Sequence, residues 1–411
     1  MLLSGFARRR VSRIRGSGEH RAFGAPMNQN CTLWTLRVAC FKSAFFASFL
    51  CRFGQRNDAP PRAVANSDKE NSKNKTREYL ESSNPAMNQT ANSRTSRMQT
   101  TTDPTQITIH AEDGYVLKGH LWRQNNDPAT NAPRPVVIIN PATSVRCSYY
   151  SRFAAFLHTN GFDVITYDYR GIGGSRPASL RNLNAGWLDW GRLDFEAVLQ
   201  MASRTFPNQP VQVVAHSVGG VLVGLAPSNH LVDRVFTMGA QFAHWRDYAN
   251  HKRFGMLIKW HAIMPLLTAA LGYFPGGRLG WMEDTPRGVV RDWIAPQPRF
   301  EDAFQRGPHA LTEAERAKLV EGFAALHAPT LALSVTDDEF GTASAIERLL
   351  AYFKNSPNTH LRIPPEAIGH REIGHFAFFH SRFETSLWQI PLEWLKAHSV
   401  RADLQRFVVG K

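Results

Sequence analysis

The chain has 411 residues, 43% of them apolar, so it is long enough for one large domain with an insertion or for two average domains. Its net charge of +14 would favour a nucleic-acid partner only if that charge belonged to the folded part. Residues 1–100 hold 17 Lys or Arg against 6 Asp or Glu, whereas the remaining 311 hold 31 against 28. The basic excess therefore lies in the first 100 residues, and we expect no nucleic-acid partner.

These first 100 residues are rich in Arg, Asn, Ser, Lys and Thr, and residues 55–101 lack apolar periodicity, so we expect a disordered basic leader. Its apolar stretch, residues 31–53, is interrupted by two basic residues and falls short of the ~20 residues that a membrane span needs. The composition changes near Met87 and Met98, which favours a translation start placed too far upstream over a targeting segment. We expect no stable membrane insertion.

Three of the four cysteines lie in the leader, which leaves Cys147 alone in the rest of the chain. The rest of the chain therefore cannot form an internal disulfide, and a reducing compartment, the cytoplasm, is the simplest fit.

From Thr105 onward short apolar runs alternate with helical patterns, which is typical of a mostly parallel sheet covered by helices on both faces. Two segments around a Glu-Asp-Gly turn, residues 107–110 and 115–122, should form an opening antiparallel pair. The further expected elements are strands at residues 135–140, 163–167, 211–214, 234–238 and 330–335, and helices at residues 150–160 and 387–396. The sequence thus predicts an α/β domain with a doubly wound sheet.

About 90 residues separate the strand that ends near Gly239 from the strand that begins at Thr330. An insertion of that length requires its own packing, and it holds four of the ten tryptophans: Trp245, Trp260, Trp281 and Trp293. Its most apolar part, residues 262–274, is interrupted by Pro265 and is expected to be too short to cross a bilayer. We expect a core of residues 101–240 and 328–400, with residues 241–327 as a helical cap.

The strand at residues 211–214 runs into Ala215-His216-Ser217-Val218-Gly219-Gly220 and then into an apolar stretch that suits a buried helix. A serine in a sharp turn between strand and helix forms a nucleophile elbow, which requires small residues two positions before and two after it. Ala215 and Gly219 meet that requirement, so Ser217 is the candidate nucleophile. His216 should point away from the serine and have a structural role.

A serine hydroxyl needs a neighbouring base, and the base needs a third group that holds its tautomer. Hydrolases with a nucleophile elbow carry the three groups in the chain order serine, acid, histidine, with the acid beyond a late strand. Asp337 and Asp338 follow the strand at residues 330–335, and we favour Asp338 because the acid usually lies a few residues past the strand. The alternative for this segment is a solvated acidic turn.

Three histidines compete for the role of base: His370, His375 and His380. Residues 373–379 are mostly apolar, which places His375 in a partly desolvated position, whereas His370 is followed by Arg371 and Glu372. We therefore assign His375 as the base and expect the other two at the surface or in supporting positions.

Acyl transfer also needs N–H donors aimed at the developing oxyanion. One should be the backbone N–H of Val218, directly after the nucleophile. The other should come from the turn at residues 140–144, where Pro141 has no N–H, so Ala142 is the first choice and Thr143 the next.

Several segments carry a resemblance to a known superfamily: Phe153-Ala154-Ala155-Phe156, residues 161–164 (GFDV), 166–177 (TYDYRGIGGSRP), 273–276 (YFPG), 336–339 (TDDE) and 373–376 (IGHF). Together they resemble the α/β-hydrolase superfamily, in particular an uncharacterised branch known as predicted α/β hydrolases. The similarity covers roughly residues 105–398. It implies the α/β-hydrolase fold and the triad, but not the substrate, because members include esterases, lipases, peptidases and thioesterases.

We expect no metal and no organic cofactor. The glycines of residues 168–175 do not form a Gly-x-Gly-x-x-Gly pattern, no Gly-Lys-Ser/Thr follows, and neither His-Glu-x-x-His nor Cys-x-x-Cys occurs.

The leading functional hypothesis is hydrolysis of a small-molecule ester or thioester with an apolar acyl group, through an acyl-enzyme. Amide cleavage is the second, and a cap carboxylate that holds a substrate amine would support it, with Glu283 and Asp284 as the nearest candidates. A non-catalytic binding protein and a scaffold anchored through residues 31–53 are weaker alternatives. Dehalogenase chemistry is disfavoured because it would need an acid at position 217.

Overall fold

The computed structural model describes residues 103–124, 134–295, 297–307 and 309–410. The expectations for the leader, including its disorder and the apolar residues 31–53, lie outside the described residues.

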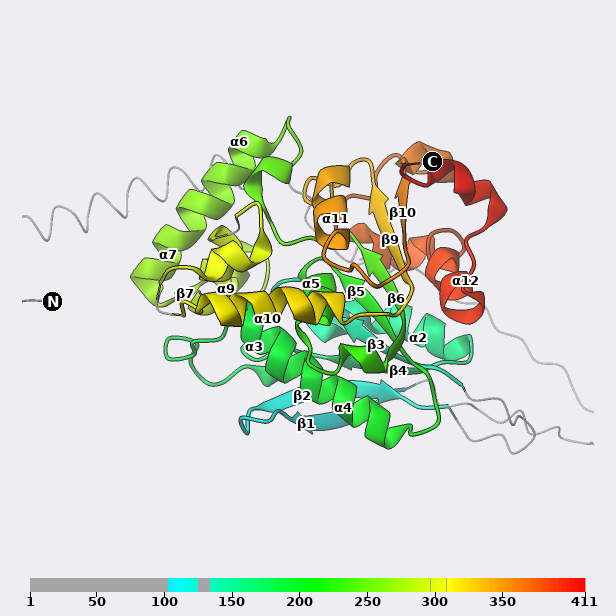
Figure 1. The fold of residues 1–411 in the computed structure, drawn as a ribbon, viewed down its shortest axis with the longest axis horizontal. Helices are drawn as coiled ribbons and strands as arrows, with labels where there is room; N and C mark the ends of the chain where they lie inside the picture. Colours follow the sequence, from blue (N-terminus) through cyan, green and yellow to red (C-terminus); the bar gives the residue numbers. More distant parts are fainter. Residues whose placement is uncertain (1–102, 125–133, 296, 308, 411) are drawn as a thin grey trace, which may run out of the picture. The chain divides into compact units, whose positions relative to one another are not determined.

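The central sheet has eight strands in the order β1-β2-β4-β3-β5-β6-β9-β10 (Figure 1). The strands are β1 (Thr105–His110), β2 (Val116–Trp122), β3 (Val136–Asn140), β4 (Asp163–Tyr167), β5 (Val211–His216), β6 (Val232–Met238), β9 (Thr330–Val335) and β10 (Asn358–Ile363). β1 pairs with β2 and β2 with β4 in antiparallel fashion, whereas all other neighbours are parallel. The mostly parallel, doubly wound α/β sheet is therefore confirmed.

Strand β10 is absent from the sequence-based prediction. Its residues, Asn-Thr-His-Leu-Arg-Ile, include polar and charged side chains and give no continuous apolar run. The strand lies at the edge of the sheet, where it pairs with β9 alone among the named strands. An edge strand needs fewer apolar residues, so the pattern used to find central strands does not detect it.

Alternating side chains of the strands pack into two apolar clusters, one on each face of the sheet. One cluster includes α2 (Ser151–Thr159) and α12 (Gln389–Ala397). In it the ring centroids of Phe153 and of Trp388, the residue just before α12, lie 5.2 Å apart. The other cluster includes α4 (Glu196–Thr205), α5 (Val218–Leu225), α10 (Glu313–Ala324) and α11 (Ala343–Leu350). Between β4 and α4 lie α3 (Trp187–Asp189) and a π-helical segment, Trp190–Phe195.

The segment inserted between β6 and β9 is mostly helical. Besides two short 3₁₀ helices, Trp245–Asp247 and Phe300–Phe304, its elements before α10 are α6 (Arg253–Met256), the π-helical Leu257–Ile263, α7 (Met264–Leu271), β7 (Tyr273–Phe274), α8 (Gly276–Leu279), β8 (Thr285–Pro286) and α9 (Arg287–Ile294). Two of its tryptophans, Trp260 and Trp293, stack with ring centroids 5.0 Å apart. These aromatic side chains thus contribute to packing within the insertion.

One helix in the described residues, Arg253–Leu271, is long and apolar enough to cross a membrane by length and composition alone, with 19 residues and a mean hydropathy of 1.4. The expectation that this region is too short was therefore wrong. Pro265 lies in the first turn of α7 and follows a π-helical segment, so the helix continues through it. Only 22% of the apolar window is buried, and Phe254 and Leu266 are exposed.

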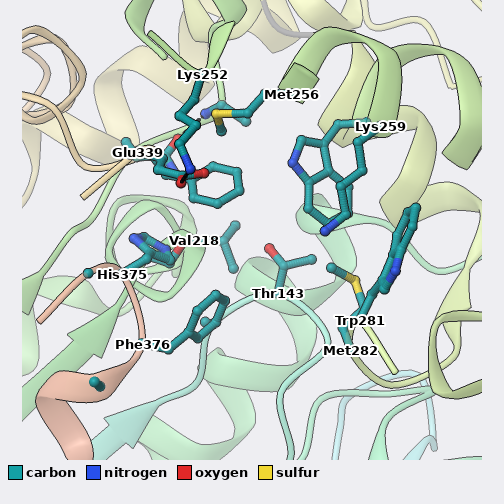
Figure 2. A pocket seen from close by; sticks show the side chains of 18 of the residues that line it. Thr143, Val218, Lys252, Met256, Lys259, Trp281, Met282, Glu339, His375 and Phe376 are labelled. Carbon is teal, nitrogen blue, oxygen red and sulfur yellow. Dashed lines mark hydrogen bonds and ion pairs between the residues drawn. The ribbon is translucent and has the colours of Figure 1, made fainter. Parts of the chain in front are cut away.

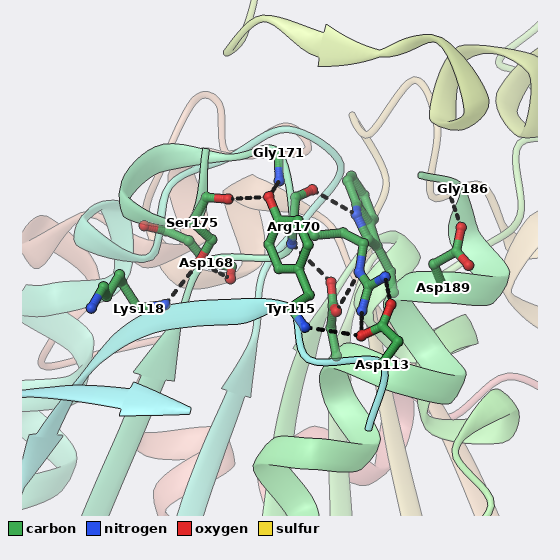
Figure 3. A network of polar contacts seen from close by, with 11 residues as sticks. Asp113, Tyr115, Lys118, Asp168, Arg170, Gly171, Ser175, Gly186 and Asp189 are labelled. Atoms are coloured by element: carbon green, nitrogen blue, oxygen red, sulfur yellow. Dashed lines mark hydrogen bonds and ion pairs between the residues drawn. The ribbon is translucent and has the colours of Figure 1, made fainter. Parts of the chain in front are cut away.

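Hydrogen bonds and ion pairs with aspartate side chains hold the loop after β4 in place (Figure 3). Asp168 accepts hydrogen bonds from the backbone N–H groups of Cys147 and Gly174, at 2.7 and 2.8 Å. Arg170 forms ion pairs with Asp194 at 2.7 Å and with Asp113 of the β1–β2 turn at 2.6 Å. The network fastens the opening hairpin to the loop.

Candidate active site

Ser217 occupies the turn between β5 and α5, in the sharp conformation that an elbow requires. Its φ of 55° and ψ of −123° are strained for a residue with a side chain, and its N–H donates to the Met238 carbonyl at 3.0 Å. At Gly219 an added Cβ would lie 2.5 Å from the Asn140 carbonyl oxygen, so glycine is required there. Ala215, the small residue two positions before the serine, is fully buried in the core.

Asp338 and His375 meet on neighbouring loops. Asp338 Oδ2 lies 2.7 Å from His375 Nδ1, and Oδ1 accepts hydrogen bonds from the backbone N–H groups of Phe340 and Gly341, both at 2.8 Å. Burial alone would raise the pKa of Asp338, but attraction to His375 and these hydrogen bonds outweigh it, so the pKa is lowered. The ionised carboxylate is thus suited to hold a proton on His375 Nδ1 and to leave Nε2 as the basic atom.

Asp337, the alternative acid, has a different set of partners. Its Oδ2 accepts the backbone N–H groups of Ile373 and Gly374, at 2.8 and 2.9 Å. Asp337 therefore holds the backbone of the loop that carries His375, whereas Asp338 contacts the His375 ring.

Ser217 and His375 line the same cavity, and both are largely buried. The Ser217 hydroxyl has no hydrogen bond to any residue in the described ranges; such contacts often tighten only when substrate binds. Of the competing histidines, His370 packs against the Phe383 ring and His380 is exposed at the edge of the cavity.

A buried hydrogen-bond chain joins the turn after β3 to the loop that carries His375. The Ala142 N–H donates to the Tyr150 hydroxyl at 2.9 Å, and that hydroxyl lies 2.8 Å from His216 Nδ1. His216 Nε2 lies 2.9 Å from the His375 carbonyl oxygen. Burial, aided by repulsion from His375, lowers the pKa of His216 to about 3, so the ring is neutral and donates from Nε2. His216 thus has the structural role expected for it.

The same chain bears on the choice between Ala142 and Thr143 for the oxyanion hole. Ala142 was the first choice, but its N–H already donates to Tyr150. The N–H groups of Thr143 and Val218 have no acceptor within the described part of the chain, and both residues line the cavity near its centre in Figure 2. No sequence pattern indicates this contact, because the Tyr150 hydroxyl reaches the Ala142 N–H only through tertiary packing.

The cavity has a volume of about 510 Å³ and lies between the core and the inserted segment. The insertion supplies mainly apolar and aromatic lining: Met256, Trp260, Trp281, Met282 and Trp293. The two carboxylates of the insertion that were considered for amine recognition are engaged elsewhere, since Glu283 pairs with Arg146 at 2.8 Å and Asp284 with Arg176 at 2.9 Å. Nowhere in the described ranges do three or more His, Cys, Asp or Glu side chains form a group that could hold a metal ion.

A parallel sheet with a strained serine between strand and helix defines an α/β hydrolase. The family model described as serine aminopeptidase, S33, matches residues 131–367, more than half of the chain, and the protein belongs to this family of the α/β-hydrolase superfamily. A search of curated proteins found no match.

Solved structures similar to this chain include several hydrolases. A soluble variant of monoglyceride lipase from Saccharomyces cerevisiae is 15% identical, with a TM-score of 0.48 over 71% of this chain and 96% of the lipase. An esterase of Pyrococcus furiosus is 12% identical, with a TM-score of 0.45 over 72% of this chain and 90% of the esterase. An acylaminoacyl peptidase of Pyrococcus horikoshii is also 12% identical, with a TM-score of 0.45 over 74% of this chain and 43% of the peptidase.

Proposed function

We propose that the protein is a serine hydrolase that cleaves a carboxylic ester or thioester with an apolar acyl group. The observation that carries this proposal is the 2.7 Å contact between Asp338 and His375 beside a cavity that also contains the strained Ser217. The apolar lining of that cavity supports the apolar acyl group. As part of the same proposal, residues 241–327 act as the cap and the protein works in the reducing cytoplasm.

In the proposed mechanism, Ser217 Oγ attacks the substrate carbonyl carbon while His375 Nε2 takes the hydroxyl proton. The N–H groups of Val218 and Thr143 stabilise the oxyanion of the tetrahedral intermediate. The intermediate collapses, the bond to the alcohol or thiol breaks, and the leaving group takes the proton from His375. His375 then removes a proton from water, which attacks the acyl-enzyme, and the second tetrahedral intermediate collapses. The bond to Ser217 Oγ breaks, Oγ takes the proton back from His375, and the carboxylic acid is released.

Cleavage of an amide is the second candidate, and the description of the matched family as serine aminopeptidase is the observation in its favour. The ion pairs of Glu283 and Asp284 with arginines count against these two residues as a site for a substrate amine.

The proposal is tested by labelling the full chain with a fluorophosphonate probe beside Ser217→Ala, with turnover of p-nitrophenyl esters and aminoacyl p-nitroanilides in parallel. We expect labelling that Ser217→Ala abolishes, and faster turnover of the esters. Preferential turnover of the anilides would favour the amide reading. A protein that is folded by circular dichroism but is never labelled would overturn the hydrolase proposal in favour of a binding protein.

A further inference from the structure

Lys259, in the π-helical segment Leu257–Ile263, places its ammonium group in the lining of the cavity. The Nζ atom lies 4.4 Å from the ring centroid of Trp260 and 4.2 Å from that of Trp281. It has no hydrogen bond or ion pair to any residue that the structure describes. The other lysine of the lining, Lys252, is paired with Glu339 at 2.9 Å.

In this position the Lys259 ammonium group loses hydration that its neighbours only partly replace. A lysine ammonium is a compact, strongly hydrated charge, and the faces of two indole rings replace only part of its hydration. Burial accordingly lowers the pKa of Lys259, and the attraction of Glu339 opposes that shift. A bound anion would supply the missing partner, and a charge-assisted hydrogen bond in a partly dry cavity is stronger than one in water.

The acidic residues of the lining do not provide this partner. Glu339 is paired with Lys252. Asp337 accepts two backbone N–H groups through Oδ2, and its Oδ1 has no partner in the described residues and forms no ion pair with Lys259. Glu372, the third, is exposed. Within the described ranges, no carboxylate therefore forms an ion pair with the Lys259 ammonium.

The position of Lys259 relative to the proposed triad suggests which part of a substrate reaches it. In Figure 2, His375 lies on one side of the cavity, Lys259 and Trp281 lie on the other, and Val218 and Thr143 lie between them. A substrate carbonyl held by the N–H groups of Val218 and Thr143 would direct one of its substituents towards Lys259.

We propose that Lys259 is a specificity-determining residue that binds a carboxylate at the far end of the acyl group, so that the preferred substrates are half-esters of dicarboxylic acids. The inference rests on the proposed function, because it assumes that Ser217 attacks the ester carbonyl. The apolar side chains between the two ends contact the methylene chain, and Lys259 contacts the terminal carboxylate.

The test compares p-nitrophenyl half-esters of dicarboxylic acids, from succinate to suberate, with the same esters capped as methyl esters. We expect that at one chain length the full-length protein turns over the free carboxylate with a kcat/KM at least about tenfold above that of its methyl ester. Lys259→Gln should abolish this preference and Lys259→Arg should retain part of it. Arg278→Gln, which removes an exposed charge of the same insertion outside the cavity lining, is the matched control and should retain it in full.

The outcomes separate the two proposals. Absence of fluorophosphonate labelling in the wild type would overturn the proposed function together with this inference. Labelling and turnover without a carboxylate preference at any chain length would overturn the role of Lys259 alone, and this measurement needs no variant. An equal loss of both ester series in Lys259→Gln would instead assign Lys259 to packing the two indoles.

Discussion

At the scale of single residues, the two adjacent acids of the loop after β9 have separate tasks. Asp338 contacts the His375 ring, and Asp337 holds the backbone of the loop that carries this ring. We expect Asp338→Asn to lower kcat/KM for a p-nitrophenyl ester by about 10³- to 10⁴-fold, because asparagine favours the wrong histidine tautomer. Asp337→Asn keeps an oxygen acceptor for the loop, so it should lower kcat/KM by about tenfold or less. A larger loss of kcat/KM in Asp337→Asn than in Asp338→Asn would instead assign the role of the acid to Asp337.

Gly219 is a second residue whose identity follows from local geometry. A methyl group there would meet the Asn140 carbonyl oxygen, a backbone atom that cannot rotate away. We expect Gly219→Ala to lower the free energy of unfolding by about 1–3 kcal/mol, measured by urea denaturation. Ala215→Gly, the matched change two residues before the serine, should cost about 1 kcal/mol or less. Equal stability of wild type and Gly219→Ala would contradict the close approach.

At the scale of elements, the hydrogen-bond chain from Ala142 through Tyr150 and His216 couples the turn after β3 to the loop that carries His375. Tyr150→Phe removes the central hydroxyl and leaves two buried polar groups unpaired, each at a cost of about 1–3 kcal/mol. Because the hydroxyl positions both the turn and the loop, we also expect kcat to fall about 10- to 100-fold with little change in KM.

The matched control is Tyr352→Phe. The Tyr352 hydroxyl likewise accepts a backbone N–H, from Phe300 at 2.8 Å, and lies 2.6 Å from a side-chain acceptor, Glu301. Tyr352 does not line the cavity, so its loss should lower stability and leave kcat unchanged. Should Tyr150→Phe behave in the same way, the buried chain would have a structural role only.

The elements that the sequence predicted well are those whose signal is local. The central strands are rich in apolar and β-branched residues, and their predicted ends differ from the observed ones by two residues or fewer. Strand β10 was missed because an edge strand lacks this composition, and the helix Arg253–Leu271 was underestimated because a proline was taken as its interruption. The partner of the Ala142 N–H could not be predicted, because tertiary packing brings the Tyr150 hydroxyl to it, and the oxyanion-hole role of Ala142 stays a prediction.

At the scale of the whole molecule, the neutral buried His216 makes stability depend on pH. Its pKa is about 3 in the folded state against an ordinary value of about 6.5, so between these values only the unfolded chain takes up the proton. Stability from this residue is present above pH 6.5 and is lost as the pH falls towards 3.

The measurement is the free energy of unfolding of wild type and His216→Gln between pH 4.5 and 7. As the pH falls, the free energy of unfolding of the wild type should decrease by up to about 1.4 kcal/mol more per pH unit than that of the variant. This difference corresponds to the uptake of one proton by the unfolded chain. Parallel pH profiles would mean that His216 takes up its proton in the folded state as well.

Cys147 is buried beside the loop after β4, and burial, with the nearby Asp168 carboxylate, raises the pKa of its thiol to about 12. Since alkylation requires an accessible thiolate, native Cys147 should be protected at neutral pH. In a triple variant with Cys31→Ser, Cys40→Ser and Cys51→Ser it is the only cysteine of the chain. The rate at which iodoacetamide modifies this variant then reports how often the structure around Cys147 opens locally while the rest of the protein stays folded.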